Sequence, residues 1–185
     1  MRLEFKEPKL EAILGLTDNI KEDERRFSKV ENTIKFLWNR NAVAVTILID
    51  DIAITLEPNQ IMTVTYLQHV SFKATEGPLT ALLFNREFYC ISDHDSEVSC
   101  NGILFFGTQD IPIVSIPKEM QKRFDLLYEV LVEEFATPDR IQGDMLQMLL
   151  KRFIIMSTRL AKEQLELKSL SNDQIEIIRK FNYLV

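Results

Sequence analysis

Side chains that could carry acid–base or metal chemistry are few in this sequence. It contains two histidines, His69 and His94. His94 stands between Asp93 and Asp95, but neighbouring side chains in an extended segment point to opposite faces, so this triplet is a poor ligand set and is interpreted as a solvated loop. His69 is interpreted as a hydrogen-bonded histidine in a half-buried strand. Because a zinc or iron site needs three good ligands, we expect no metal, no cofactor, no catalytic residue and hence no enzyme.

The two cysteines, Cys90 and Cys100, are too few for a disulfide framework. They either meet across a hairpin as a redox pair or lie in the core as reduced thiols, which a reducing compartment favours. The chain does not open with a charged segment followed by an apolar run, and no apolar run reaches the roughly 18 residues of a membrane helix. We therefore expect a cytoplasmic protein without a membrane partner.

The charge is distributed unevenly along the 185 residues, of which 46% are hydrophobic. This composition excludes intrinsic disorder and suits one domain or one and a half. Residues 1–116 carry 11 Lys and Arg against 17 Asp and Glu, a net of −6, whereas residues 117–185 carry 11 of each. Since neither part is basic, this chain alone is not expected to bind nucleic acid phosphates strongly.

The pattern of apolar residues changes near Pro117, from short β-branched runs to long helical periodicities. Upstream, the first thirty residues are ambiguous, with a short helical turn over 10–14 as one interpretation. Alternation and turn residues then predict successive strands that suit a sandwich, a barrel or half of a jelly roll. These strands cover 34–38, 43–49, 52–56, 61–67, 79–84 and 103–106. The fold class is therefore predicted to be α+β.

Two amphipathic helices are predicted downstream of this β region. The first begins with Pro117 in its first turn and ends near Phe135. The second begins with Thr137 as its N-cap and Pro138 at its first helical position. A third helix is predicted from Ser171, and it lacks a Gly or Pro stop signal before the last residue, so we expect the chain to be a fragment of a longer one.

The second helix carries two apolar stripes instead of one. The first runs from Ile141 to Leu160, and the second contains Leu146, Leu150 and Ile154. Together they exceed the roughly 100° arc that packs on a single core. Either the helix lies between two elements of its own chain, or a second subunit covers one stripe. The dimer alternative is preferred, with a homodimer interface formed by Leu146, Leu150, Phe153 and Ile154.

Three stretches resemble the N-terminal regulatory domain of AraC/XylS-type transcription regulators, most closely those of Bacteroidetes-like bacteria. Residues 54–72 read ITLEPNQIMTVTYLQHVSF, and residues 81–106 read ALLFNREFYCISDHDSEVSCNGILFF. The third stretch, residues 175–185, reads IEIIRKFNYLV and resembles the start of the family's DNA-binding domain. The resemblance extends over nearly the whole chain from about Val30.

The resemblance implies a cupin-like double-stranded β-barrel (jelly roll) followed by two to three α-helices. It implies a sensor barrel over 1–116 and a helical dimerisation region over 117–168. Residues 171–185 would be the first helix of a helix-turn-helix domain that is otherwise absent from this chain. DNA would be bound only through that domain. A small effector would bind inside the barrel and bias the helices. Its candidate pocket residues, which suit core packing equally well, are Trp38, Tyr66, His69, Phe84 and Tyr89.

Two other functions remain as alternatives. A metal-dependent cupin enzyme would need several histidines on inward strands, but His69 has no partner histidine on a neighbouring strand. A cyclic-nucleotide sensor also places a β-roll before a long dimer helix, but it needs a Gly-Glu pair and an Arg for the phosphate. The sequence has only the reverse step, Glu76-Gly77, and both alternatives are disfavoured.

Overall fold

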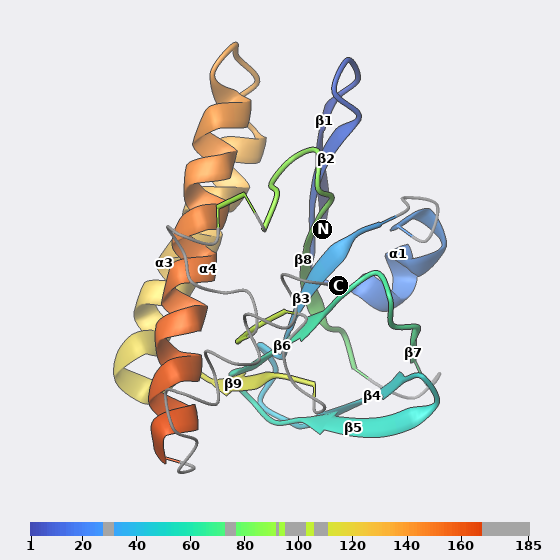
Figure 1. The fold of residues 1–185 in the computed structure, drawn as a ribbon, viewed down its shortest axis with the longest axis vertical. Coiled ribbons are helices and arrows are strands. Elements are labelled where there is room, and N and C mark those ends of the chain that lie inside the picture. Colours follow the sequence, from blue (N-terminus) through green and yellow to red (C-terminus); the bar gives the residue numbers. More distant parts are fainter. Residues whose placement is uncertain (28–31, 73–76, 92, 95–102, 106–110, 168–185) are drawn as a thin grey trace.

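The computed structural model describes residues 1–27, 32–72, 77–91, 93–94, 103–105 and 111–167. Along the chain, an N-terminal hairpin and a short helix precede a series of strands, and two long helices follow (Figure 1). The strands are β1 (Arg2–Glu7), β2 (Ala12–Thr17), β3 (Ile34–Trp38), β4 (Val45–Ile49), β5 (Ile52–Leu56), β6 (Gln60–Val64), β7 (Val70–Phe72), β8 (Thr80–Phe84) and β9 (Ile113–Ser115). The helices are α1 (Ile20–Phe27), α3 (Lys118–Phe135) and α4 (Gln142–Leu167).

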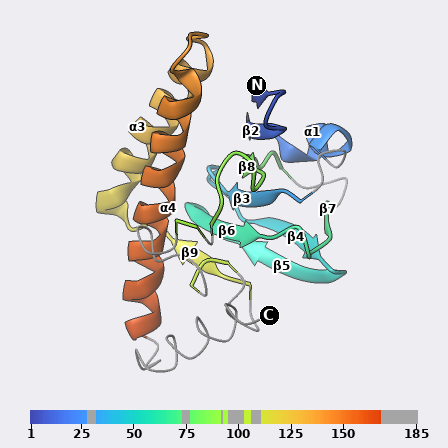
Figure 2. The ribbon, with the colours of Figure 1, turned by 45° about the horizontal axis from the view of Figure 1, so that its top comes forward.

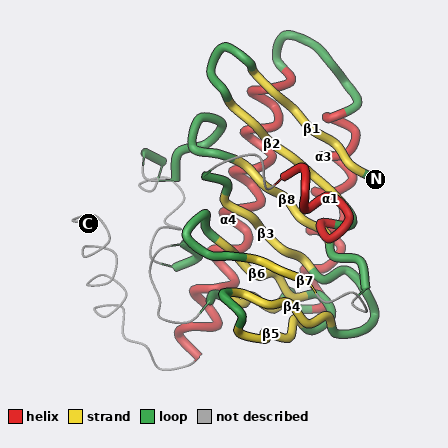
Figure 3. Tube along the Cα trace, turned by 90° about the vertical axis from the view of Figure 1, so that its right-hand side faces the viewer, coloured by secondary structure: helices red, strands yellow, loops and turns green. Residues whose placement is uncertain are grey.

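The strands form two antiparallel sheets. A six-stranded sheet has the order β1-β2-β8-β3-β6-β9, and a three-stranded sheet has the order β5-β4-β7. Figure 3 shows the strands of the large sheet side by side in front of the two long helices. Its central strand β3 pairs Phe36 with Leu82 of β8 and with Thr63 of β6. This register fixes which side chains share each face.

The molecule has three layers, with the six-stranded sheet in the middle. Helices α3 and α4 cover one face of that sheet, and the three-stranded sheet lies on its other side (Figure 2). Side chains alternate along β3, so Phe36 and Trp38 enter the core beneath the helices while Leu37 enters the core between the sheets. Because it is covered on both sides, β3 is apolar on both faces except at the half-buried Lys35.

The two long helices form an antiparallel pair. Pro117 is the N-cap of α3, one position before the helix, and its fixed φ suits that start. Helix α4 begins at Gln142, later than the Thr137-Pro138 start that the sequence predicts. Asp139 instead accepts a hydrogen bond from the Ile141 backbone N–H at 2.9 Å in the preceding turn.

The start of α4 packs closely on the edge of the large sheet. A Cβ added to Gly143 would lie 2.9 Å from the tip of the Phe5 ring of β1, so a larger residue here would require that ring to move. The absence of a side chain at Gly143 thus leaves room for the Phe5 ring against the first turn of α4.

The α+β class is confirmed, but the closed jelly-roll barrel is not. In the described residues the two sheets remain separate, with β1 and β9 as the edges of one and β5 and β7 as the edges of the other. The helical turn over 10–14 is wrong, because Ala12 begins β2 and pairs with Glu7 in the β1–β2 hairpin. The strand predicted over 103–106 is not found, because residues 103–105 form a turn and an isolated bridge, and Phe106 lies outside the described residues. The predicted helix from Ser171 also lies outside them.

Candidate functional site

Aromatic rings join the six-stranded sheet to the helix pair. The ring centroid of Trp38 lies 6.0 Å from that of Phe124 in α3 and 6.1 Å from that of Phe153 in α4. Phe36 meets Phe153 edge to face at 5.0 Å. Such pairs contribute about 0.5–1.5 kcal/mol each beyond the burial of their area. This sheet–helix junction therefore couples strand β3 to both helices.

An arginine closes the junction at the surface. The Arg40 guanidinium carbon lies 3.8 Å from the ring centroid of Tyr128 and 4.9 Å from that of Trp38, and Arg40 Nη2 donates a hydrogen bond to Asp125 Oδ1 at 3.2 Å. Burial raises the pKa of the Tyr128 hydroxyl, and the carboxylate of Asp18 adds to this, while the Arg40 charge lowers it. Arg40 thus links the end of β3 to α3 through cation–π contacts and an ion pair.

A small cavity and an unsatisfied donor lie at this junction. The cavity has a volume of about 10 Å³, enough for one water at most. Trp38 lines it, and the buried Trp38 indole N–H has no hydrogen-bond partner among the residues that the structure describes. An unsatisfied buried donor costs about 1–3 kcal/mol. The other lining residues are Leu16, Phe36, Thr80, Leu82, Tyr128, Leu131 and Phe153.

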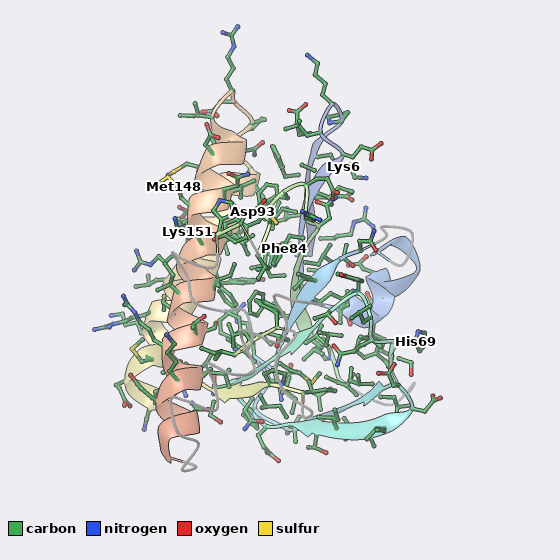
Figure 4. All side chains as sticks on the ribbon, in the orientation of Figure 1. Lys6, His69, Phe84, Asp93, Met148 and Lys151 are labelled. Atoms are coloured by element: carbon green, nitrogen blue, oxygen red, sulfur yellow. The ribbon has the colours of Figure 1, made fainter. Side chains whose placement is uncertain are left out.

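Three of the five predicted pocket residues lie in this core, but they fill it. Phe84 lies between the sheet and the helices (Figure 4), and its ring is 6.4 Å from Phe36. Tyr89 meets Phe84 at 6.2 Å and stacks on His94 at 4.5 Å. The exposed fractions are 4% for Trp38, 0% for Phe84 and 4% for Tyr89. These three rings are packing residues, and the described cavity that Trp38 lines holds one water at most.

The other two predicted pocket residues, Tyr66 and His69, lie elsewhere. Tyr66 is 49% exposed, and both residues belong to the connection between β6 and β7. Figure 4 shows His69 on the far side of the molecule from the helices. The His69 backbone N–H donates to Asp50 Oδ1 at 2.8 Å, so its main chain holds the β4–β5 turn in place. The structure therefore brings three of the five predicted pocket residues together and places Tyr66 and His69 elsewhere.

Residues that could hold a metal do not come together in the part of the chain that the structure describes. No group of three or more His, Cys, Asp or Glu side chains gathers there. His94 Nδ1 lies 2.9 Å from the Cys90 carbonyl oxygen, a contact within one turn of the chain. Cys90 is half-buried, whereas Asp95 and Cys100 lie outside the described residues, so the Asp-His-Asp and paired-cysteine interpretations stay as predictions.

The predicted dimer-interface residues face the chain's own core. Leu146, Leu150 and Ile154 are fully buried, and Phe153 is 3% exposed, all within the sheet–helix core. They leave no surface for a second subunit. Ile141 and Met145, assigned to the core stripe, are instead 61% and 39% exposed. Periodicity identified two faces of α4 but assigned them to the wrong partners.

The outer face of the helix pair carries the features that sequence reasoning missed. From the middle of α3 to the beginning of α4, five large apolar side chains are exposed by 39–65%. A groove of about 770 Å³ also runs between α3 and α4. The spacing of Arg152, Ile155 and Arg159 places them on one side of α4, a signal that the sequence does contain. The five apolar residues, called here the hairpin patch, are Leu126, Val130, Ile141, Met145 and Met148.

Comparisons with known proteins do not establish a family. No family model matches the chain, and no curated protein matches it. One solved structure that it resembles is the crystal structure of the AraC-like transcriptional activator CuxR, at a TM-score of 0.43 and 6% identity, covering 80% of this chain. The match spans 48% of the CuxR chain, about half its length. A likeness at this level establishes neither a shared fold nor a shared function.

Among the described helices, none is both long and apolar enough to cross a membrane.

Proposed function

We propose that this chain is the non-catalytic regulatory part of an AraC-type transcription regulator in the cytoplasm, with DNA bound by a helix-turn-helix domain outside these residues. The three stretches of sequence resemblance support the family. The observation that carries a regulatory role is the aromatic sheet–helix junction, in which Trp38 of β3 contacts both α3 and α4. A ligand that shifts β3 would directly change the contacts between Trp38 and the two helices.

The small effector is proposed to bind at this junction by opening it. The unsatisfied Trp38 N–H supplies a donor, and the cavity beside it supplies a starting point for expansion. The bound state would then be a minor conformation that the effector stabilises. A ligand with an aromatic or alkyl body and one hydrogen-bond acceptor fits these groups.

A homodimer is proposed to form through the hairpin patch. Two apolar patches related by a two-fold axis bury each other, since an isologous interface matches a surface with its own copy. Met148, at 65% exposed, is the most exposed member of the patch and lies on the side of α4 away from the sheet (Figure 4). An exposed cluster of this kind on a soluble surface commonly marks an interaction site.

The effector hypothesis is tested through Trp38, the single tryptophan of the chain. Screening small metabolites by Trp38 fluorescence and thermal shift should find a ligand that changes both signals. Trp38→Phe should weaken the binding of that ligand, because it removes the indole donor. Binding to this variant is measured by thermal shift, since the variant contains no tryptophan. If no compound changes the fluorescence or the melting temperature, the effector hypothesis is contradicted. The dimer hypothesis is tested separately.

The dimer hypothesis is tested by sizing the protein in solution. The wild-type chain should be a dimer at high concentration, and Met145→Asp should make it monomeric without changing its circular dichroism. The matched control is Ile52→Asp on β5, where the side chain is 67% exposed and far from the helices. A wild-type protein that stays monomeric would contradict the interface. The genomic DNA after codon 185 tests the family: an in-frame helix-turn-helix domain is expected.

A further inference from the structure

The groove between α3 and α4 combines an apolar floor with a charged rim. Met120 of α3 faces Ile155, Met156 and Leu160 of α4 across it, and Met156 and Leu160 are buried. Methionine side chains are flexible and polarisable, so they adapt to apolar surfaces of different shapes. The floor therefore suits an apolar partner surface that need not match it rigidly.

The rim of this groove is basic in an acidic protein. Four basic side chains line it against two acidic ones, Glu119 and Glu163, in a chain whose net charge is −6. Among the described residues, no ion pair joins Arg123, Arg152 or Arg159 to a carboxylate. Arg123 Nη1 instead lies 3.5 Å from the Met120 sulfur. The fourth basic residue is Lys151, which lies on the outer side of α4 (Figure 4).

We propose that the groove binds an acidic amphipathic helix of a partner protein. A helix fits the long shape of the groove, because a segment of α4 from Met148 to Glu163 extends for about 22 Å, the length of four helical turns. Its apolar stripe would lie on the methionine floor, and its carboxylates would accept charge-assisted hydrogen bonds from the arginines. This interaction goes beyond the proposed regulatory function and does not depend on it.

Charge disfavours the two occupants that this chain itself could supply. A second copy docked groove to groove would bring two basic rims together, and like charges repel. The C-terminal segment 168–185 carries three basic and two acidic residues, so it too has the wrong sign. The hairpin patch differs because its five members are all apolar, although it shares Met148 with the groove.

The test uses designed peptides of about 18 residues, a length that spans the groove as a helix. One peptide has Leu on one helical face and Glu on the other, a second has Lys in place of Glu, and a third has the acidic composition in scrambled order. Binding to the 185-residue chain is measured by fluorescence anisotropy at low and high salt. The acidic amphipathic peptide should bind at least tenfold more tightly than the other two, and salt should weaken it.

The matched variants reverse two charges in the groove or outside it. The double variant Arg152→Glu and Arg159→Glu should bind the acidic peptide at least tenfold more weakly. It should also bind the Lys peptide, which the wild-type groove does not favour. Arg86→Glu with Arg140→Glu has the same net charge, changes two exposed arginines that do not line the groove, and should change neither affinity. Circular dichroism and thermal melts of both variants check that the fold is retained.

Three outcomes would overturn the proposal. In the first, the acidic amphipathic peptide binds no better than its scrambled version. In the second, both double variants bind the acidic peptide equally weakly, so the affinity depends only on the net charge of the protein. In the third, anionic lipid vesicles or single-stranded DNA bind through Arg152 and Arg159 while the peptide does not, which would assign the groove to another class of partner.

Discussion

The two faces of the six-stranded sheet are built from different kinds of side chain. The core beneath the helices contains Phe36, Trp38, Phe84 and Tyr89, together with aromatic residues of α3 and α4. The fully buried core between the two sheets is made of aliphatic residues and Met62. Only the aromatic face contains Trp38 with its unsatisfied donor and the small cavity beside it.

This difference concerns what holds each layer together. The rings of the aromatic core add directional edge-to-face contacts to the burial of their area, as between Phe36 and Phe153. The inter-sheet core depends on the close packing of aliphatic side chains. The two faces of β3 are therefore expected to respond differently to substitution.

The largest expected effect separates the inner and outer faces of α4. Leu150→Asp places a carboxylate in the aromatic core, where an unpaired buried charge costs several kcal/mol, so the chain should fail to fold. Met148→Asp, two residues away on the exposed side, should leave the folded state intact. Circular dichroism and sizing measure both. A folded, monomeric Leu150→Asp protein would restore the original interface assignment.

A comparison within β3 distinguishes the two faces directly. Phe36→Ala should lower the free energy of unfolding by about 3–5 kcal/mol and Leu37→Ala by about 2–5 kcal/mol, as measured by urea titration. Only Phe36→Ala should also change the native fluorescence of Trp38, because Leu37 points to the other layer. Equal changes in Trp38 emission in the two variants would show that the core beneath the helices and the core between the sheets are not independent.

Removing Arg40 should have a smaller effect, confined to the aromatic face. Arg40→Ala removes the cation–π contacts and the ion pair to a half-exposed Asp125, so about 1–2 kcal/mol of stability should be lost. Because Arg40 lowers the pKa of Tyr128, its removal should raise that pKa further. Absorbance titration of tyrosinate measures this shift. Asp125→Asn is the control, and it should cost less than Arg40→Ala.

The strands of the central sheet could be predicted because alternation is a local property. The alternation of Ile34, Phe36 and Trp38 predicts β3 with the bounds that the structure has. The β1–β2 hairpin was missed although its first strand alternates charged and apolar residues, because the spacing of Leu10, Ile13 and Leu14 also suits a helical turn.

The partners of each face could not be predicted from periodicity either. Leu150 and Met148 are both apolar, and only the packing of α4 on the sheet decides that one is buried and the other exposed. Similarly, Arg40 follows β3 in a turn, and its contact with Asp125 joins residues 85 positions apart. Nothing local to Asn39-Arg40-Asn41 signals that contact. The sequence therefore shows which residues can form a core, but their assignment to a layer depends on the tertiary fold.

The smallest predicted effect, and the one with a defined pH dependence, concerns Lys35. This residue alternates with Phe36 and pairs with Val64 and Leu83, so it belongs to the inter-sheet side. Burial lowers the pKa of the Lys35 ammonium. Lys35→Met should therefore stabilise the protein at pH 7 by about 0.5–2 kcal/mol in urea titration, since it removes a desolvated charge.

The sign of the pH dependence follows from proton linkage. Between the lowered pKa of Lys35 in the folded state and its ordinary value of 10.5, the unfolded chain binds the extra proton, so wild-type stability rises with pH. The advantage of Lys35→Met should shrink across that window. Tyr128, whose pKa is raised, lowers stability as pH increases above about 10, so both proteins are compared in a Tyr128→Phe background. Lys6→Met, at an exposed lysine, is the control for the loss of one positive charge. A constant difference between Lys35→Met and wild type would mean that Lys35 is solvated and that the inter-sheet layer is less tightly closed than the aromatic one.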